Sequence, residues 1–88
     1  MDRIVFYDLE TTIPFKKGEQ AEILEFAAVT LSTQGLAEVD SFATLVRPST
    51  LAAVSQRSTK VNGITVKDVE VAPMFSDVAD RIFEILDG

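Results

Sequence analysis

The stretch Ile4-Val5-Phe6-Tyr7-Asp8-Leu9-Glu10-Thr11-Thr12 decides the fold of this chain, because four apolar residues in it run directly into two carboxylates. A continuous apolar run that is rich in β-branched and aromatic residues predicts a strand covered on both faces. Since side chains alternate along a strand, Asp8 and Glu10 are expected on the same face, with Cα atoms about 6–7 Å apart. The stretch therefore predicts an inner strand that ends in a pair of acids.

The acid pair at the end of this strand suggests a metal site. Two carboxylates beside a buried strand are unfavourable unless something compensates their charge. A divalent cation such as Mg²⁺ compensates them well, because it prefers carboxylate oxygen as a ligand. The alternative is that the strand ends at Leu9 and that Asp8 and Glu10 are simply solvated, as most acidic side chains are. The apolar run before the acids and the Thr-Thr pair after them favour the metal site.

Length and composition indicate one globular domain or part of one. The chain has 88 residues, of which 47% are hydrophobic and 25% are charged, and this is not the composition of a disordered segment. It contains no cysteine and no histidine, which excludes disulfides, cysteine-based zinc sites and imidazole catalysis within these residues. No apolar run has the length of a membrane span, and Met1-Asp2-Arg3 does not begin a signal peptide. We therefore expect an intracellular protein, cytoplasmic or nuclear.

The net charge of −6 is distributed unevenly along the chain. Residues 1–40 hold eight acids and three bases, and residues 68–88 hold six acids and one base. Residues 41–67 hold no acid and four bases, namely Arg47, Arg57, Lys60 and Lys67. A basic middle segment is compatible with contact to a polyanion, because phosphate contacts need Lys and Arg. It is equally compatible with a solvated loop, and the sequence leaves both interpretations open.

Two more strands and a connecting loop follow the first strand. Proline, glycine and charged residues mark residues 13–20 as a loop, in which Phe15 either stacks on a nucleic-acid base or tucks under the loop. Residues 21–31 and residues 36–47 are predicted as strands, and Pro48 closes the second of them because it cannot donate to a ladder. Strands joined by short connections are most simply antiparallel neighbours, so a three-stranded antiparallel meander is expected.

The C-terminal half is predicted to be mostly helical. Residues 49–62 are polar and irregular, with a helical turn near residues 51–54, and residues 65–68 have the spacing of a capping box with a short helical turn. From Pro73 to a C-cap at Gly88 we expect an amphipathic helix of about 14 residues that covers one face of the sheet. Its apolar stripe is Phe75, Val78, Ile82 and Ile85.

The first stretch also resembles a known motif. Residues 6–12 (FYDLETT) are similar to the first motif of the DEDD superfamily of 3′-to-5′ exonucleases. Four further segments are similar to that family in the same order along the chain: residues 22–29 (EILEFAAV), 45–48 (LVRP), 61–65 (VNGIT) and 72–75 (APMF). Together they cover nearly the whole chain and look most like a plant subgroup of exonuclease-domain proteins.

The resemblance implies an α/β fold of the ribonuclease H-like type. This chain would be its N-terminal part, a three-stranded antiparallel meander followed by a crossover helix, without the later strands. By the same resemblance Asp8 and Glu10 would bind two Mg²⁺ or Mn²⁺ ions, with Asp8 bridging both and Glu10 on the side of the attacking water. The 3′ end of single-stranded DNA or RNA would be the substrate, and its contacts would be Leu9, Thr11, Thr12 and Phe15.

Three departures from the family pattern limit what the chain does alone. Ile13-Pro14 replaces the glycine that many members have, and Asn62 replaces a histidine. Two further aspartates and a histidine or tyrosine base belong, in the family, to a region after Gly88, and the helix acids Asp77, Asp80 and Asp87 are expected to be a solvated face that does not replace them.

We therefore expect the 88 residues alone to be inactive or nearly so, as part of a single exonuclease domain that stops before the second acidic motif. In this family a fourth strand pairs in parallel with the first, so an open edge prone to self-association is expected here. One alternative is a catalytically dead module that binds nucleic acid or protein. The other is a different Mg²⁺ enzyme with two carboxylates, such as a phosphatase.

Overall fold

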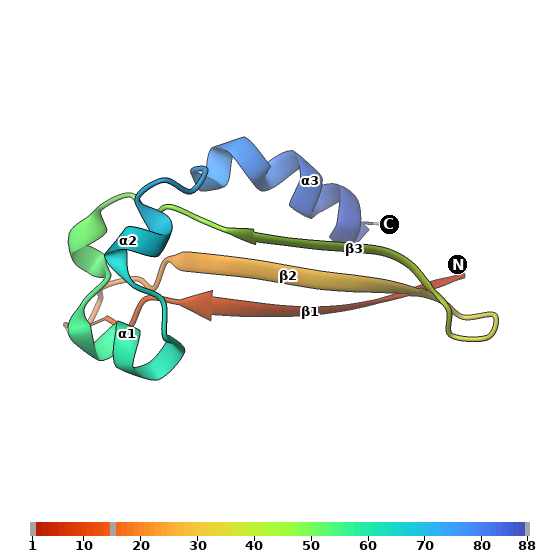
Figure 1. The fold of residues 1–88 in the computed structure, drawn as a ribbon, viewed down its shortest axis with the longest axis horizontal. Coiled ribbons are helices and arrows are strands. Elements are labelled where there is room, and N and C mark those ends of the chain that lie inside the picture. The colour runs from red at the N-terminus through yellow and green to blue at the C-terminus, as the bar shows by residue number, and fades with distance from the viewer. Residues whose placement is uncertain (1, 15, 88) are drawn as a thin grey trace.

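A three-stranded antiparallel sheet forms the body of the computed structural model, which describes residues 2–14 and 16–87 (Figure 1). Strand β1 spans Arg3–Thr11, β2 spans Ile23–Ser32 and β3 spans Glu38–Leu45, in the order β1-β2-β3. Both strand pairs are antiparallel. The predicted meander is confirmed.

The turn between β2 and β3 is longer than predicted, so the third strand begins two residues later. Gly35 has φ +82° and Leu36 has φ 54°, and both residues are therefore in the left-handed region. Because a leucine at positive φ cannot continue an extended strand, the turn includes the residue at which the strand was expected to begin.

Strand β2 is the centre of the sheet, as its sequence indicated. Leu24, Phe26, Ala28 and Thr30 are buried, and the alternate residues along the strand are half-buried. This alternation follows from the period of two along a strand, with one face turned to the core.

Strand β1, in contrast, is an edge strand, and the prediction that it is covered on both faces was wrong for the described residues. Phe6 and Tyr7 are 59% and 58% exposed, and Ile4 and Leu9 are 40% and 39% exposed. The physical reason is that β1 lies at the edge of the sheet and, among the described strands, pairs only with β2. The open edge that we expected on this strand is therefore present.

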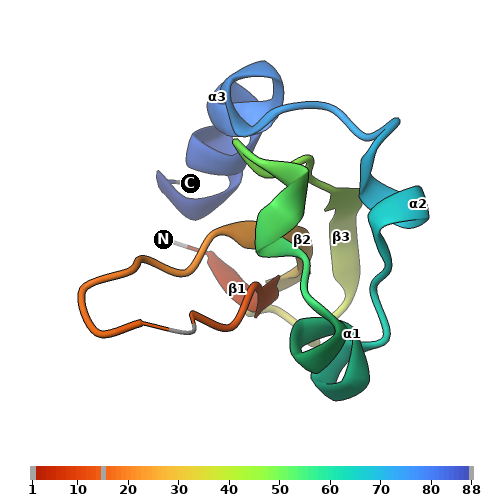
Figure 2. The same ribbon diagram turned by 90° about the vertical axis from the view of Figure 1, so that its left-hand side faces the viewer.

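Two helices and a 3₁₀ turn gather at the end of the sheet where β1 ends (Figure 2). They are η1 (Leu51–Ala53), α1 (Gln56–Asn62) and α2 (Val66–Val69). The capping box predicted for α2 is present, since Thr65 and Asp68 each accept from the other's backbone amide. Helix α1 replaces part of the irregular segment that we predicted; it is delimited by Ser55, which caps Ser58 N, and by Gly63 at φ +77°.

Helix α3 spans Phe75–Asp87 and crosses the face of the sheet opposite the acid pair (Figure 1). It begins two residues after Pro73, because the amide of Met74 donates to the Asp77 carboxylate at 2.9 Å and starts the helix there. Its predicted C-cap, Gly88, lies outside the described residues. Among these residues no helix combines the length and the apolar character that crossing a bilayer requires.

The core has two parts, one under each group of helices. Leu24, Val54, Ile64 and Val69 form the part at the helical end. Phe26, Ala28, Ile82 and Ile85 form the part under α3, so Ile82 and Ile85 are core residues as predicted, whereas Phe75 is 38% exposed.

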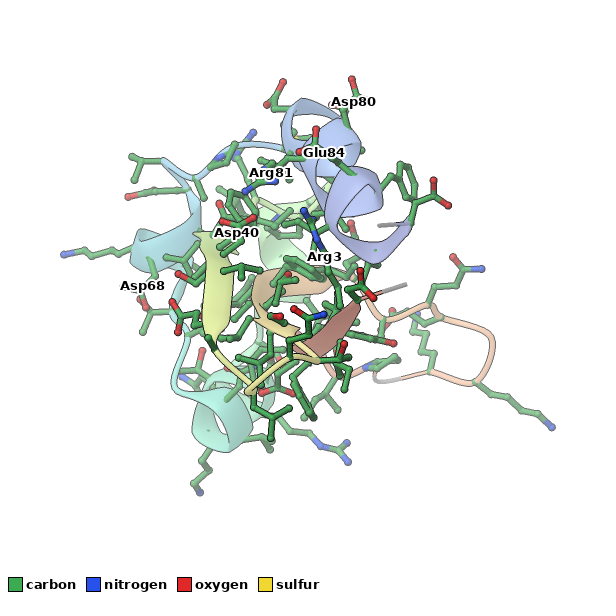
Figure 3. All side chains as sticks on the ribbon, turned by 90° about the vertical axis from the view of Figure 1, so that its right-hand side faces the viewer. Arg3, Asp40, Asp68, Asp80, Arg81 and Glu84 are labelled. Carbon is green, nitrogen blue, oxygen red and sulfur yellow. The ribbon has the colours of Figure 1, made fainter. Side chains whose placement is uncertain are left out.

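One ion pair ties α3 to β3. Arg81 donates to the Asp40 carboxylate at 2.9 Å and to Glu84 at 2.9 Å, and its guanidinium lies 5.3 Å from the ring centroid of Phe42 (Figure 3). The hydrogen bond from Arg81 lowers the pKa of Asp40 below its ordinary value of 3.8.

Candidate active site

The acid pair lies on the sheet face that α3 leaves open. Asp8 is opposite Ala27 and Glu10 is opposite Glu25, and the ladder is regular until an irregularity between Glu10 and Thr11. Residues two apart in a regular strand share a face, so Asp8 and Glu10 lie on one side of β1. Tyr7 points to the other side, where its ring stacks on the core residue Phe26 with centroids 6.3 Å apart.

A third carboxylate lies beside the pair, and the sequence did not single it out. Glu25 is the direct cross-strand neighbour of Glu10, and side chains of opposite residues in an antiparallel pair lie on the same face, about 5 Å apart. Like charges in this arrangement repel each other, so a cation at this end of β1 would relieve the repulsion. The register that pairs the two residues is not readable from the sequence.

The backbone directly after the acids is fixed by hydrogen bonds to the start of β2. The amide of Thr12 donates to the carbonyl of Glu22 at 2.8 Å, and the amide of Glu22 donates to Thr12 Oγ1 at 2.9 Å. Thr12 is 3% exposed. The Glu22 carboxylate in turn accepts from the amide and the hydroxyl of Ser49, each at 2.8 Å. The second threonine of the motif is therefore structural in this conformation.

Asn62 holds the same segment from the opposite side. Its Nδ2 donates to the carbonyl of Thr11 at 2.9 Å, and its Oδ1 accepts from the amide of Ile64 at 2.9 Å. This contact joins residues 51 positions apart in the chain. From the sequence, Asn62 was apparent only as a departure from the family, and its contact with Thr11 depends on the long-range packing of α1 against the end of β1.

The remaining predicted substrate residues are only partly brought together. Leu9, Thr11 and Thr12 follow or flank the acids at the end of β1, whereas Phe15 lies outside the described residues. Leu9 shares its face with Tyr7 and points away from the acid pair. Asp77, Asp80 and Asp87 lie on α3, across the sheet from the acid pair, as we expected for residues that do not join it.

The chemistry of the donor set suits a hard divalent cation, but the set is small. Among residues 2–14 and 16–87, no three potential ligand side chains converge where they could hold a metal. Asp8 and Glu10 supply carboxylate oxygens, which Mg²⁺ and Mn²⁺ prefer. A shallow hollow of about 430 Å³ lies next to Asp8 on the open face, and its lining includes Phe6, Ala27 and Ala43.

Two solved structures that are similar to this chain are 3′-exonucleases. A 3′-exonuclease solved for 3′-end-specific recognition of the histone mRNA stem-loop is 30% identical with a TM-score of 0.82, over 98% of this chain and 30% of that one. The nuclease domain of 3′hExo, a DEDDh family member bound to rAMP, is 30% identical with a TM-score of 0.76, over 98% of this chain and 44% of that one. The class defined by the fold is thus the N-terminal part of a ribonuclease H-like DEDD exonuclease.

Sequence comparison gives the same family. The model of the Exonuclease family (RNase_T) matches residues 5–88, so the chain belongs to this family. Protein NEN4 of Arabidopsis thaliana is 46% identical over 87 residues and Protein NEN2 is 45% identical over 85 residues, which confirms the predicted likeness to plant proteins. The chain spans 34% and 18% of the lengths of these two relatives.

Proposed function

We propose that this chain is the N-terminal part of a two-metal-ion 3′-to-5′ exonuclease domain that hydrolyses phosphodiester bonds at the 3′ end of single-stranded DNA or RNA. The observation that carries the proposal is the placement of Asp8 and Glu10 on one open face of β1, in a chain that belongs to the exonuclease family. We also propose an intracellular location, in the cytoplasm or the nucleus, where nucleic-acid substrates are present.

Asp8 and Glu10 are the residues that would hold Mg²⁺ or Mn²⁺. Bound ions supply an activated water and stabilise the charge that develops on the phosphate. The carboxylates themselves act as ligands and leave the roles of general acid and base to other groups. Thr12 and Asn62 keep the backbone of residues 11–12 in place, where it is expected to approach the terminal nucleotide.

Two carboxylates hold Mg²⁺ weakly without further ligands or a substrate phosphate. We therefore propose that the 88 residues need additional acidic ligands and a base from the remainder of a complete domain. The proposal is supported by the small part of each relative's length, 18% of NEN2 and 34% of NEN4, that the chain covers.

A nuclease assay tests the function. The 88-residue chain, and the same chain within a complete exonuclease domain, are incubated with 5′-labelled single-stranded DNA and RNA in Mg²⁺ or Mn²⁺. We expect shortening from the 3′ end only with the complete domain. Asp8→Asn and Glu10→Gln should abolish it, whereas Glu38→Gln, which removes an exposed carboxylate at the start of β3, should not.

Three results would go against parts of the proposal. Robust turnover by the 88 residues alone contradicts the need for further ligands. An active Asp8→Asn variant of the complete domain contradicts the metal role of the acid pair. Binding without cleavage by the complete domain selects the alternative, a catalytically dead binding module.

A further inference from the structure

The exposed face of α1 carries cations that the fold does not neutralise. Arg57 and Lys60 are exposed, and among the described residues neither has a carboxylate within ion-pair distance; both ion pairs of the described chain belong to Arg81. Residues three apart on a helix are neighbours on its surface, so Arg57 and Lys60 form one basic patch. No acidic residue occurs between residues 41 and 67 to offset it.

The surroundings of this patch are suited to phosphate groups. Arg57 and Lys60 line a hollow of about 710 Å³ together with Val54, Ser55, Gln56, Thr59 and Val66. Gln56 is exposed beside Arg57 and Lys60, and an amide side chain next to Lys and Arg is a usual contact of a sugar–phosphate backbone, whereas the hydroxyls of Ser55 and Thr59 are engaged within the fold. The side of α1 opposite the patch is used internally, since Ser58 is fully buried and Asn62 donates to the Thr11 carbonyl.

The patch lies on the helix that is bonded to the end of β1. Asn62, the last residue of α1, is bonded to the carbonyl of Thr11, one residue after Glu10. Lys60 and Arg57 lie two and five residues earlier on the same helix, about 3 and 7.5 Å along its axis, and at 3.6 residues per turn both are on the side of α1 turned away from Asn62. Figure 2 shows the end of β1 with α1 beside it.

We propose that the Arg57–Lys60 face of α1 binds the sugar–phosphate backbone of the substrate strand, a few nucleotides from its 3′ end. This inference rests on the proposed function, because it takes the end of β1 to be the site of the terminal nucleotide. It resolves the two interpretations of the basic middle segment in favour of a polyanion contact. An acidic protein segment has the same sign of charge as the substrate strand, but it does not account for the position of the patch on the helix that is bonded to the end of β1.

Binding, measured without cleavage, tests the proposal. The probes are 5′-fluorescein-labelled single-stranded DNA and RNA of about 12 nucleotides, titrated by fluorescence anisotropy in Mg²⁺ against the folded 88-residue chain. We compare Arg57→Gln, Lys60→Gln and their double variant with the unsubstituted chain. Arg3→Gln is the matched control, because it removes one exposed cation at the other end of β1, beside Asp40 and α3 (Figure 3).

The expected result is a specific change in salt dependence. A lost phosphate contact lowers the slope of log affinity against log salt by about 0.7 for a single strand, so the double variant should lose about 1.4. The affinity advantage of the unsubstituted chain should then shrink about sevenfold between about 50 and 200 mM salt. Circular dichroism checks that every variant is folded, and Arg3→Gln should leave the slope unchanged.

Several results would overturn the proposal. They are an unchanged slope in the double variant, an equal loss in Arg3→Gln, absence of oligonucleotide binding by the folded chain at 50 mM salt, and tighter binding of a poly-glutamate peptide than of either oligonucleotide. The proposed function is judged separately, by the nuclease assay. If Asp8→Asn inactivates the complete domain while the double variant keeps its salt slope, the exonuclease function stands and the α1 contact is rejected.

Discussion

Replacing Asn62 by alanine should destabilise the chain by about 2–4 kcal/mol. The side chain makes two partly buried hydrogen bonds of 2.9 Å, one to the Thr11 carbonyl and one from the Ile64 amide. Removing the side chain leaves the Thr11 carbonyl and the Ile64 amide without these hydrogen-bond partners. Each unsatisfied group lowers the free energy of unfolding by about 1–2 kcal/mol. This is a large share of the roughly 5–10 kcal/mol by which a domain of this size is stable.

Asn62→Asp divides the effect between the two bonds. Aspartate keeps the oxygen that accepts from the Ile64 amide, but it puts a second oxygen in place of the amide donor that faces the Thr11 carbonyl. The free energy of unfolding should therefore fall by about 1–2 kcal/mol. The loss should be local to the end of β1, and hydrogen exchange at Thr12 should therefore accelerate more than exchange in the middle of β2.

Urea unfolding followed by circular dichroism measures these differences, with the slope m expected to stay constant. Gln56→Ala is the matched control, since Gln56 is exposed on the same helix and should change stability by less than about 0.5 kcal/mol. If Asn62→Ala were no more destabilising than Gln56→Ala, the idea that Asn62 fixes the end of β1 would be refuted.

Three further predictions concern the core, the surface ion pair and the sheet edge. Leu24→Ala, at a fully buried position of β2, should cost about 3–5 kcal/mol in urea unfolding, and a cost below about 1 kcal/mol would contradict the core assignment. Because Arg81 lowers the pKa of Asp40, the stability that this pair contributes is present above the ordinary value of 3.8 and lost as the pH falls below it. The difference in stability between the parent chain and Asp40→Asn should thus disappear in acid, and a difference that persists there would be evidence against the pair. The open edge of β1 should cause self-association or poor solubility, and a clean monomer in sedimentation at high concentration would count against it.

The central strand was predictable, and the reason is local. Leu24, Phe26, Ala28 and Thr30 alternate with half-buried residues, and alternation is carried by the sequence itself. The spacing of Asp8 and Glu10 likewise gave their common face, because no irregularity interrupts β1 between them.

The features that were missed depend on long-range contacts. The sequence of α1, QRSTKVN, has no apolar stripe, so the helix is specified by the caps at Ser55 and Gly63 and by contacts of Ser58 and Asn62. The pairing of Glu10 with Glu25 depends on a register that only the folded sheet fixes. The exposure of β1 depends on the neighbours available to it, and a run of apolar residues does not reveal whether they are present.

The most direct test of the account is the location of metal binding in solution. Mn²⁺ is titrated into the isotope-labelled chain, and the paramagnetic broadening of backbone amide signals is mapped by NMR. We predict broadening that is strongest around Asp8, Glu10 and Glu25 and that is lost in the Asp8→Asn/Glu10→Gln variant but kept in Glu38→Gln. Broadening spread evenly over all acidic residues, or centred on the acidic face of α3, would contradict the assignment of the end of β1 as the metal-binding site.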